Sequence, residues 1–342
     1  MDAYAPRVGQ TRAPLILDVD TGIDDALAIL LACASPEAEL LAVTCVSGNV
    51  AAGQVTRNTL AVLDLAGRSD VEVALGCEVP LARPLRTAPE THGPEGIGYA
   101  NLPASSRTLS DRHAADLIIA EANRLPGELT LITLGPLTNL AVALQREPAL
   151  PGLLRQMVMM AGSYRSAGNT APTLEWNVAI DPEAMQAVLD GWSAVEGAPR
   201  PLALGLDVTE RAKLTPDHLA ELHLRAGDPP DSAVLRFVDD ALRFYMEFHS
   251  RYDGFYGAFL HDALALAAAL DPALLRSEAV RVEIELDGKW TTGETVTDWR
   301  RQWGRPPNLD VAVDADIETF FERLIDRLGR LASERAATGA RA

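Results

Sequence analysis

The stretch Leu15-Ile-Leu-Asp-Val-Asp-Thr-Gly-Ile-Asp-Asp25 decides the fold. Its first part, Leu15 to Asp20, is a short apolar run that predicts a buried strand. Thr21-Gly22 predicts a turn, and a helix is expected from Asp24 to Ala34. A buried strand that leads directly into a helix is typical of a protein with alternating strands and helices.

The same alternation continues along the chain. Further strands are expected at 39–45, 71–75, 129–134 and 157–160, and further helices at 51–66, 112–125, 136–144 and within a long helical stretch at 231–269. Strands separated by helices favour a mainly parallel central sheet with helices on both faces, so we predict an open, Rossmann-like α/β fold. A single domain is expected over residues 1–342, with an ordered core from about 14 to 330 and a frayed tail after Gly329.

The composition excludes several classes of partner. The 342 residues carry a formal net charge of −18, which would repel nucleic acid and anionic membranes. The three cysteines, Cys33, Cys45 and Cys77, are odd in number and have neither paired nor zinc-ligand spacing, so we expect no disulfide framework. Neither a signal peptide nor a bilayer-spanning run is visible. These observations predict a cytoplasmic protein.

Four carboxylates, Asp18, Asp20, Asp24 and Asp25, lie within eight residues at the carboxyl end of the first predicted strand. Ligands of open α/β sheets bind at this edge. Capping of the following helix would explain one or two of these acids, because the free N–H groups and the helix dipole favour negative charge there. Four carboxylates repel one another unless a cation lies among them, and oxygen ligands at this density suit Ca²⁺ or Mg²⁺.

Two further groups of residues could carry chemistry. His261-Asp262 precedes an alanine-rich helix, where a buried aspartate needs a partner or a capping role, although a lone histidine there is more often a core residue. Glu175-Trp176-Asn177, with Asn169 upstream, follows a buried strand. Solvation of a loop would explain its polarity, but a tryptophan between two hydrogen-bonding side chains suits a sugar or a base.

The segment Ile16-Leu-Asp-Val-Asp-Thr-Gly-Ile-Asp-Asp-Ala-Leu-Ala28 resembles the signature of the inosine–uridine nucleoside hydrolase family. Other segments follow in the family's order over roughly residues 14 to 330: Val46-Ser-Gly-Asn49, Thr91-His-Gly93, Leu134-Gly-Pro-Leu-Thr-Asn139, Asn169, Glu175-Trp-Asn177, Asp181-Pro-Glu-Ala184, Gly205-Leu-Asp-Val-Thr209, Leu260-His-Asp262, Gly288 and Thr291 to Asp298. Several distant motifs in register are far more specific than one. The resemblance implies an open Rossmann-like nucleoside hydrolase architecture.

The resemblance also implies an activity: hydrolysis of the N-glycosidic bond of ribonucleosides to free base and ribose, through an oxocarbenium-like transition state. It implies Ca²⁺ held by Asp20, Asp25, Asp262 and the backbone carbonyl of Leu134, with Asp20 also acting as the general base toward a Ca²⁺-bound water. The groups that it implies for substrate binding are Asp24, Asn49, His92, Asn169, Glu175, Trp176 and Asn177. It further implies His261 as the acid for the leaving base, and a homodimer or homotetramer.

Two departures from the family leave the preferred base open. The segment from Tyr252 to Phe259 differs from the family's substrate-flap helix, and Trp176 stands where phenylalanine is often found. Two other functions remain as alternatives. A haloacid-dehalogenase-like phosphatase would use Asp18 as nucleophile and Asp20 as acid, but it needs a suitably placed lysine. A non-catalytic, calcium-containing protein that binds a nucleoside or sugar is the second alternative.

Overall fold

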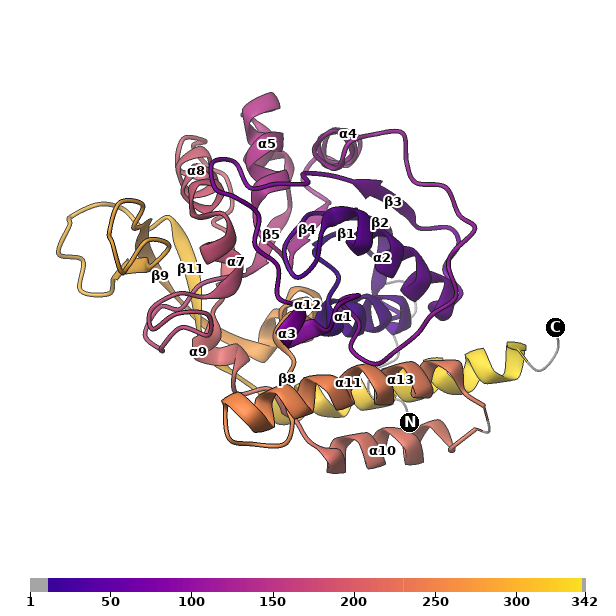
Figure 1. Ribbon diagram of the computed structural model, residues 1–342. Helices are drawn as coiled ribbons and strands as arrows, with labels where there is room; N and C mark the ends of the chain where they lie inside the picture. The colour runs from indigo at the N-terminus through magenta and orange to yellow at the C-terminus, as the bar shows by residue number, and fades with distance from the viewer. Residues whose placement is uncertain (1–11, 230, 340–342) are drawn as a thin grey trace.

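The computed structural model describes residues 12–229 and 231–339. Within these residues one sheet has nine strands (Figure 1). In spatial order they are β10 (Thr295–Asp298), β9 (Leu275–Ile284), β11 (Leu309–Ala315), β6 (Leu202–Leu204), β5 (Gln156–Met160), β4 (Thr130–Thr133), β1 (Ala13–Val19), β2 (Ala38–Cys45) and β3 (Glu72–Leu75). The strands from β11 to β3 run parallel, and only β9 pairs antiparallel with its two neighbours. The predicted, mainly parallel sheet is confirmed.

Helices cover both faces of the sheet, as predicted. One face carries α1 (Ile23–Ala34), α2 (Ala52–Ala66), α10 (Pro216–Ala226), α11 (Ala233–Tyr252), α12 (His261–Leu270) and α13 (Ile317–Gly339). The other carries α4 (Ala114–Arg124), α5 (Thr138–Arg146), α6 (Leu150–Leu153) and α8 (Pro182–Ser193). Side chains alternate along β1: Leu15 and Leu17 join the first core, and Ile16 joins the second. Of the described helices, none is both long and apolar enough to cross a membrane.

Short elements complete the fold. They are α3 (Pro89–His92), α7 (Trp176–Ile180), α9 (Leu206–Thr209), a 3₁₀ turn at Pro272–Leu274, and an antiparallel pair formed by β7 (Lys213–Leu214) and β8 (Ala258–Phe259). The segment at 80–110, which has no period in its sequence, is mostly irregular apart from α3. Three of these short elements, α3, α7 and β8, supply residues to the candidate site described below.

Two sequence-based expectations about the C-terminal part are wrong. The predicted helical stretch 231–269 is two helices, α11 and α12, because the chain turns at Gly254, whose φ of +74° suits glycine, and then forms β8. The predicted frayed tail after Gly329 continues as helix α13 to Gly339. Leu331 and Ala332 are buried, and the Arg335 guanidinium donates to the Leu65 carbonyl at 3.0 Å, so packing holds the helix in place.

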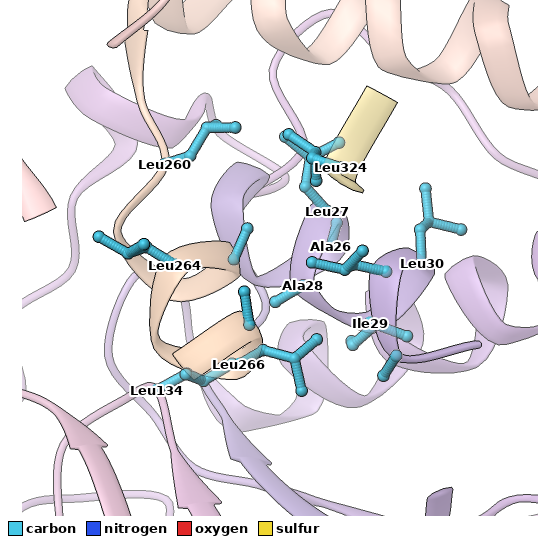
Figure 2. Close-up of a cluster of buried hydrophobic side chains, with 14 of the residues drawn as sticks. Ala26, Leu27, Ala28, Ile29, Leu30, Leu134, Leu260, Leu264, Leu266 and Leu324 are labelled. Atoms are coloured by element: carbon cyan, nitrogen blue, oxygen red, sulfur yellow. The ribbon is translucent and has the colours of Figure 1, made fainter. Parts of the chain in front are cut away.

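The packing of α12 against α1 positions the candidate site. In Figure 2, Leu266 of α12 points toward α1, which contributes Ala26–Leu30, while Leu264 projects from the opposite side of α12 and Leu324 of α13 lies beside Leu27. All of these side chains are buried. Truncating one such leucine to alanine costs about 2–5 kcal/mol, because the neighbours cannot close the cavity. The first turns of α1 and α12 are thereby fixed beside each other.

Candidate active site

Three buried carboxylates meet where the first turns of α1 and α12 adjoin. Asp24, Asp25 and Asp262 each offer an oxygen, and these atoms lie within 4.8 Å of one another. Burial, reinforced by the charge of Asp25, raises the pKa of Asp24 to about 8, and burial and the neighbouring acids also raise the pKa of Asp262. Such a cluster resists ionisation unless a cation balances it. The residues therefore fit a hard divalent metal ion.

Asp20 follows the end of β1 and is buried beside this cluster. Its Oδ2 accepts the Asn49 backbone N–H at 2.7 Å, and its own N–H donates to Asp25 Oδ1 at 3.2 Å. In the described part of the chain no protein group hydrogen-bonds to its Oδ1. A Cβ at Gly48 would lie 2.0 Å from Asp20 Oδ2, so a glycine is required there. Asp20 thus has one oxygen fixed by the protein and one available.

Asp18 has a different role from the other three acids. On β1 it follows the alternation of Ile16 toward the second core, where its Oδ1 accepts from Thr44 Oγ1 at 2.6 Å and Asn139 Nδ2 at 2.8 Å. Burial raises its pKa to about 7. Of the four acids only Asp24 lines the cavity described below, and Asp18 also lies outside the group formed by Asp24, Asp25 and Asp262. Asp18 therefore links β1 to β2 and α5. It is not placed as a phosphatase nucleophile.

A cavity of about 500 Å³ opens beside the carboxylates. One wall, the carboxylate wall, is formed by Asp24, Asn49, Leu134, Glu175, Asn177 and Asp262. The second wall, the ring wall, consists of aromatic and imidazole rings: His92, Tyr245, Phe248, His249, Phe259 and His261. Its rings are contiguous: centroids lie 5.5 Å apart for His92–Tyr245, 4.5 Å for Tyr245–His249 and 4.7 Å for His249–Phe259. The cavity thus offers hydrogen bonds on one wall and aromatic surface on the other.

The loop after β5 brings the predicted Asn169 and Glu175-Trp176-Asn177 to this cavity. Glu175 caps α7, accepting the Asn177 N–H at 2.8 Å and the Gly162 N–H at 2.9 Å. Asn169 Oδ1 accepts the Trp176 N–H at 3.0 Å. These bonds hold the loop, and the side chains still face the cavity. Trp176 Nε1 is buried without a partner among the described residues.

The Leu134 carbonyl, expected as a metal ligand, accepts a hydrogen bond from Asn177 Nδ2 at 2.7 Å. A carbonyl oxygen has two lone pairs, so one remains for another contact. The structure groups Asp24 with Asp25 and Asp262 by distance, whereas Asp20 lies outside that group of three. The division of the four acids between metal and ribose stays a prediction.

Two of the predicted site residues are histidines with defined partners. His92 Nδ1 accepts the Ile23 N–H at 3.1 Å, and His261 Nδ1 lies 2.8 Å from Thr209 Oγ1. Burial lowers the pKa of each to about 3, so both rings are neutral at neutral pH. Each has Nε2 left for a ligand.

Sequence reasoning missed the part of the ring wall that α11 supplies. Tyr245, Phe248 and His249 all lie in the stretch that the sequence marked only as helical. The signal was present, because Tyr245, His249 and Asp253 recur every fourth residue and so share one side of a helix. Glu210, also on the cavity, was not singled out either.

Comparison with known proteins now decides the family. Residues 15–322 match the family described as inosine-uridine preferring nucleoside hydrolase. The chain is 40% identical to the inosine-uridine preferring nucleoside hydrolase of Leishmania major, over 93% of this chain and 98% of that protein. The chain belongs to the inosine-uridine preferring nucleoside hydrolase family. The resemblance inferred from the separate motifs is confirmed.

Other members of this family are similar over nearly their whole length. The pyrimidine-specific ribonucleoside hydrolase of Salmonella arizonae is 38% identical over 92% of this chain and 98% of its own. The solved structure of a purine-preferring ribonucleoside hydrolase from Gardnerella vaginalis superposes with a TM-score of 0.86, at 32% identity, covering 94% of this chain and 99% of that one. The nucleoside hydrolase architecture expected from the sequence is therefore confirmed.

Proposed function

We propose that the chain is a calcium-dependent enzyme that hydrolyses the N-glycosidic bond of ribonucleosides to ribose and free base. Membership of the family supports ribonucleoside cleavage. The observation that carries the proposal is the cavity itself, whose carboxylate wall suits a hydroxyl-rich ribose and whose ring wall suits a planar base. Relatives include pyrimidine-specific and purine-preferring proteins, so both base classes are candidate substrates.

The carboxylates would hold the metal and activate water. We assign Asp20, Asp25, Asp262 and the Leu134 carbonyl as ligands of Ca²⁺, which when bound would orient the ribose hydroxyls and make the attacking water more acidic. Asp20 takes the proton of that water, since its Oδ1 has no protein partner among the described residues. The charge of the buried acids also favours the oxocarbenium-like sugar that forms as the bond to the base breaks.

The remaining predicted residues would orient the substrate. Hydrogen bonds to the ribose hydroxyls are assigned to Asp24, Asn49, Asn169, Glu175 and Asn177. Trp176 and His92 would contact the substrate beside the ribose. His261 would supply the proton to the leaving base through Nε2, because its Nδ1 is engaged by Thr209. Since burial keeps this ring neutral at neutral pH, it must take up that proton as the bond to the base breaks. Holding both reactants in place lowers the entropic part of the barrier.

Ribose release tests the proposal. With Ca²⁺ present, the protein should release ribose from inosine, uridine or p-nitrophenyl riboside and should release no phosphate from p-nitrophenyl phosphate. Asp20→Ala should lower ribose release by on the order of 1000-fold, since general base and metal ligand are lost together. No ribose from any of the three ribosides contradicts the proposed function. Activity of Asp20→Ala near that of the parent removes Asp20 from the role of base.

Asp18→Asn is a suitable comparison for the alternatives. A phosphatase that uses Asp18 would lose all activity, whereas the proposed hydrolase should keep most of its ribose release, because asparagine can accept the same hydrogen bonds from Thr44 and Asn139. A non-catalytic binding protein would bind ribosides without releasing ribose. The homodimer or homotetramer and the cytoplasmic location stay predictions, and light scattering tests the first.

A further inference from the structure

His249, in the last turn of α11, has one ring nitrogen engaged and one without a partner among the described residues. Its Nδ1 lies 2.7 Å from Asp253 Oδ2. The side chain is only 4% exposed, lines the cavity, and its Nε2 is buried with no hydrogen-bond partner among the described residues. Buried polar atoms in folded proteins nearly always have a partner, so an atom like this at a binding cavity points to a ligand.

The partner of Nδ1 decides what Nε2 can do. Of the three histidines on the ring wall, His92 is bonded to a backbone N–H, His261 to a threonine hydroxyl, and His249 to a carboxylate. A carboxylate accepts, so the proton of the neutral His249 ring resides on Nδ1. The lone pair is then on Nε2, which is a hydrogen-bond acceptor.

The position of His249 along α11 places it beyond the ribose. Tyr245, His249 and Asp253 lie on one side of the helix, about 6 Å apart at each step. Tyr245 is near the carboxylates, since the charges of Asp24 and Asp262 add to burial in raising the pKa of its phenol. His249 is one turn further on. If the ribose binds at the carboxylate wall, its base therefore lies next to Tyr245 and extends toward His249.

Aromatic rings hold the imidazole in place. The ring of Tyr245 lies 4.5 Å from it, that of Phe259 4.7 Å at a steep angle, and that of Phe255 5.4 Å nearly parallel. None of these rings forms a hydrogen bond with Nε2. A hydrogen bond formed in such apolar surroundings is stronger and more selective than the same bond in water.

We propose that His249, oriented by Asp253, recognises the far edge of the nucleobase, with Nε2 accepting a hydrogen bond from an N–H group of the base. This inference rests on the proposed function and deepens it. The bases of inosine and uridine carry a ring N–H at the edge away from the sugar, whereas the base of purine riboside has none. His249 is thus a specificity-determining residue, and Asp253 is its positioning residue.

The charged neighbours of His249 determine the pH range over which its Nε2 can accept a hydrogen bond from the base. Burial lowers the pKa of His249 and the Asp253 carboxylate opposes this. The other titratable groups around it are Glu210, which follows α9, Lys213 on β7, and Tyr245, His92 and His261 on the ring wall. Protonation turns Nε2 into a donor, so selectivity for an N–H base should be lost as the pH falls through the pKa of His249.

The test compares kcat/KM for inosine and for purine riboside. We expect His249→Phe, which keeps an aromatic ring, to lower the inosine value by about 10- to 100-fold more than the purine riboside value, because one buried hydrogen bond is lost. His249→Gln should recover part of the ratio through its amide oxygen. Arg236→Gln, on the exposed side of the same helix, is the matched control and should leave both values unchanged.

The possible results separate this inference from the proposed function. An equal loss for both substrates, or no loss, in His249→Phe overturns the inference and leaves ribose release intact as evidence for the hydrolase. No ribose release by the parent from any riboside overturns the proposed function first. Asp253→Asn should move the loss of inosine selectivity to lower pH, because the carboxylate charge that favours the imidazolium is removed. An unmoved pH profile contradicts the positioning role of Asp253.

Discussion

The two walls of the cavity are built in different ways. On the carboxylate wall, backbone groups fix the side chains: Glu175 accepts the Gly162 N–H at 2.9 Å, and Asn177 Nδ2 donates to the Leu134 carbonyl at 2.7 Å. The neighbouring Asp20 and Asp25 are fixed in the same way, since Asp20 accepts the Asn49 N–H and Asp25 accepts the Gly22 N–H. On the ring wall, side chains from α11 and β8 fix one another through ring contacts. The first wall has little freedom to change without loss of the site. The second can exchange rings while the fold is kept, which suits variation of the base.

The largest effect expected in this comparison is a loss of calcium affinity at the acids beside the carboxylate wall. Asp25→Asn removes a charge from the cluster of three acids, so calcium affinity should fall by on the order of 100-fold and ribose release with it. Isothermal titration calorimetry measures the affinity. Asp18→Asn is the matched control, since Asp18 is equally buried but lies outside the group of three acids, and its calcium affinity should stay within about tenfold of the parent. Equal losses of calcium affinity in the two variants would contradict the different roles assigned to Asp25 and Asp18.

The next change affects turnover and tests whether backbone groups fix Asp20 beside this wall. In Gly48→Ala the added Cβ would lie 2.0 Å from Asp20 Oδ2, so Asp20 must move, and kcat should fall by about 100-fold. Gly53→Ala is the control, because the added Cβ would lie 3.9 Å from Arg57 Nη1, an ordinary contact, and alanine favours the helix by about 0.5–1 kcal/mol. Steady-state kinetics and thermal unfolding distinguish the two. A Gly48→Ala enzyme with parental kcat would show that Asp20 tolerates displacement.

The smallest effect concerns Glu210, at the cavity beside the ring wall. Burial, and then the charge of Asp253, raises its pKa to about 7. The Glu210 carboxyl therefore holds its proton more tightly in the folded state than in the unfolded chain. Its contribution to the free energy of unfolding is fully present below pH 4.5 and is lost as the pH rises through 7. Glu210→Gln should flatten the fall in stability over this range.

Urea unfolding at pH 5 and pH 8, in the presence of a chelator, measures this difference for the parent and the variant. The effect should be small, because Glu210 is partly exposed and solvent screens its charge. Glu196→Gln, at an exposed position, serves as the control and should leave the slope of the parent unchanged. If the free energy of unfolding of Glu210→Gln changes with pH as steeply as that of the parent, Glu210 does not contribute to the pH dependence.

The contrast between the walls also explains what the sequence predicts. Asp20, Asp24 and Asp25 are neighbours in the chain, at the end of an apolar strand, so local pattern and the strand-end rule locate them. The sheet and most of its helices follow from the same periodicity. His249 and Phe259 are brought together only by the turn after α11, which interrupts an otherwise helical pattern. The ring wall therefore depends on tertiary structure, and a sequence pattern reports only that its residues lie on a helix.

The packing of α12 on α1 has a consequence for the synthesis of the protein. A ribosome releases Asp20, Asp24 and Asp25 early, but Asp262 emerges only after most of the sheet has been made. Until then the face of α1 that packs against α12 has no partner, so a nascent chain exposes apolar surface. A metal ion held by Asp24, Asp25 and Asp262 would therefore bind only after α12 has been made, and it would join the beginning of the protein to its last third.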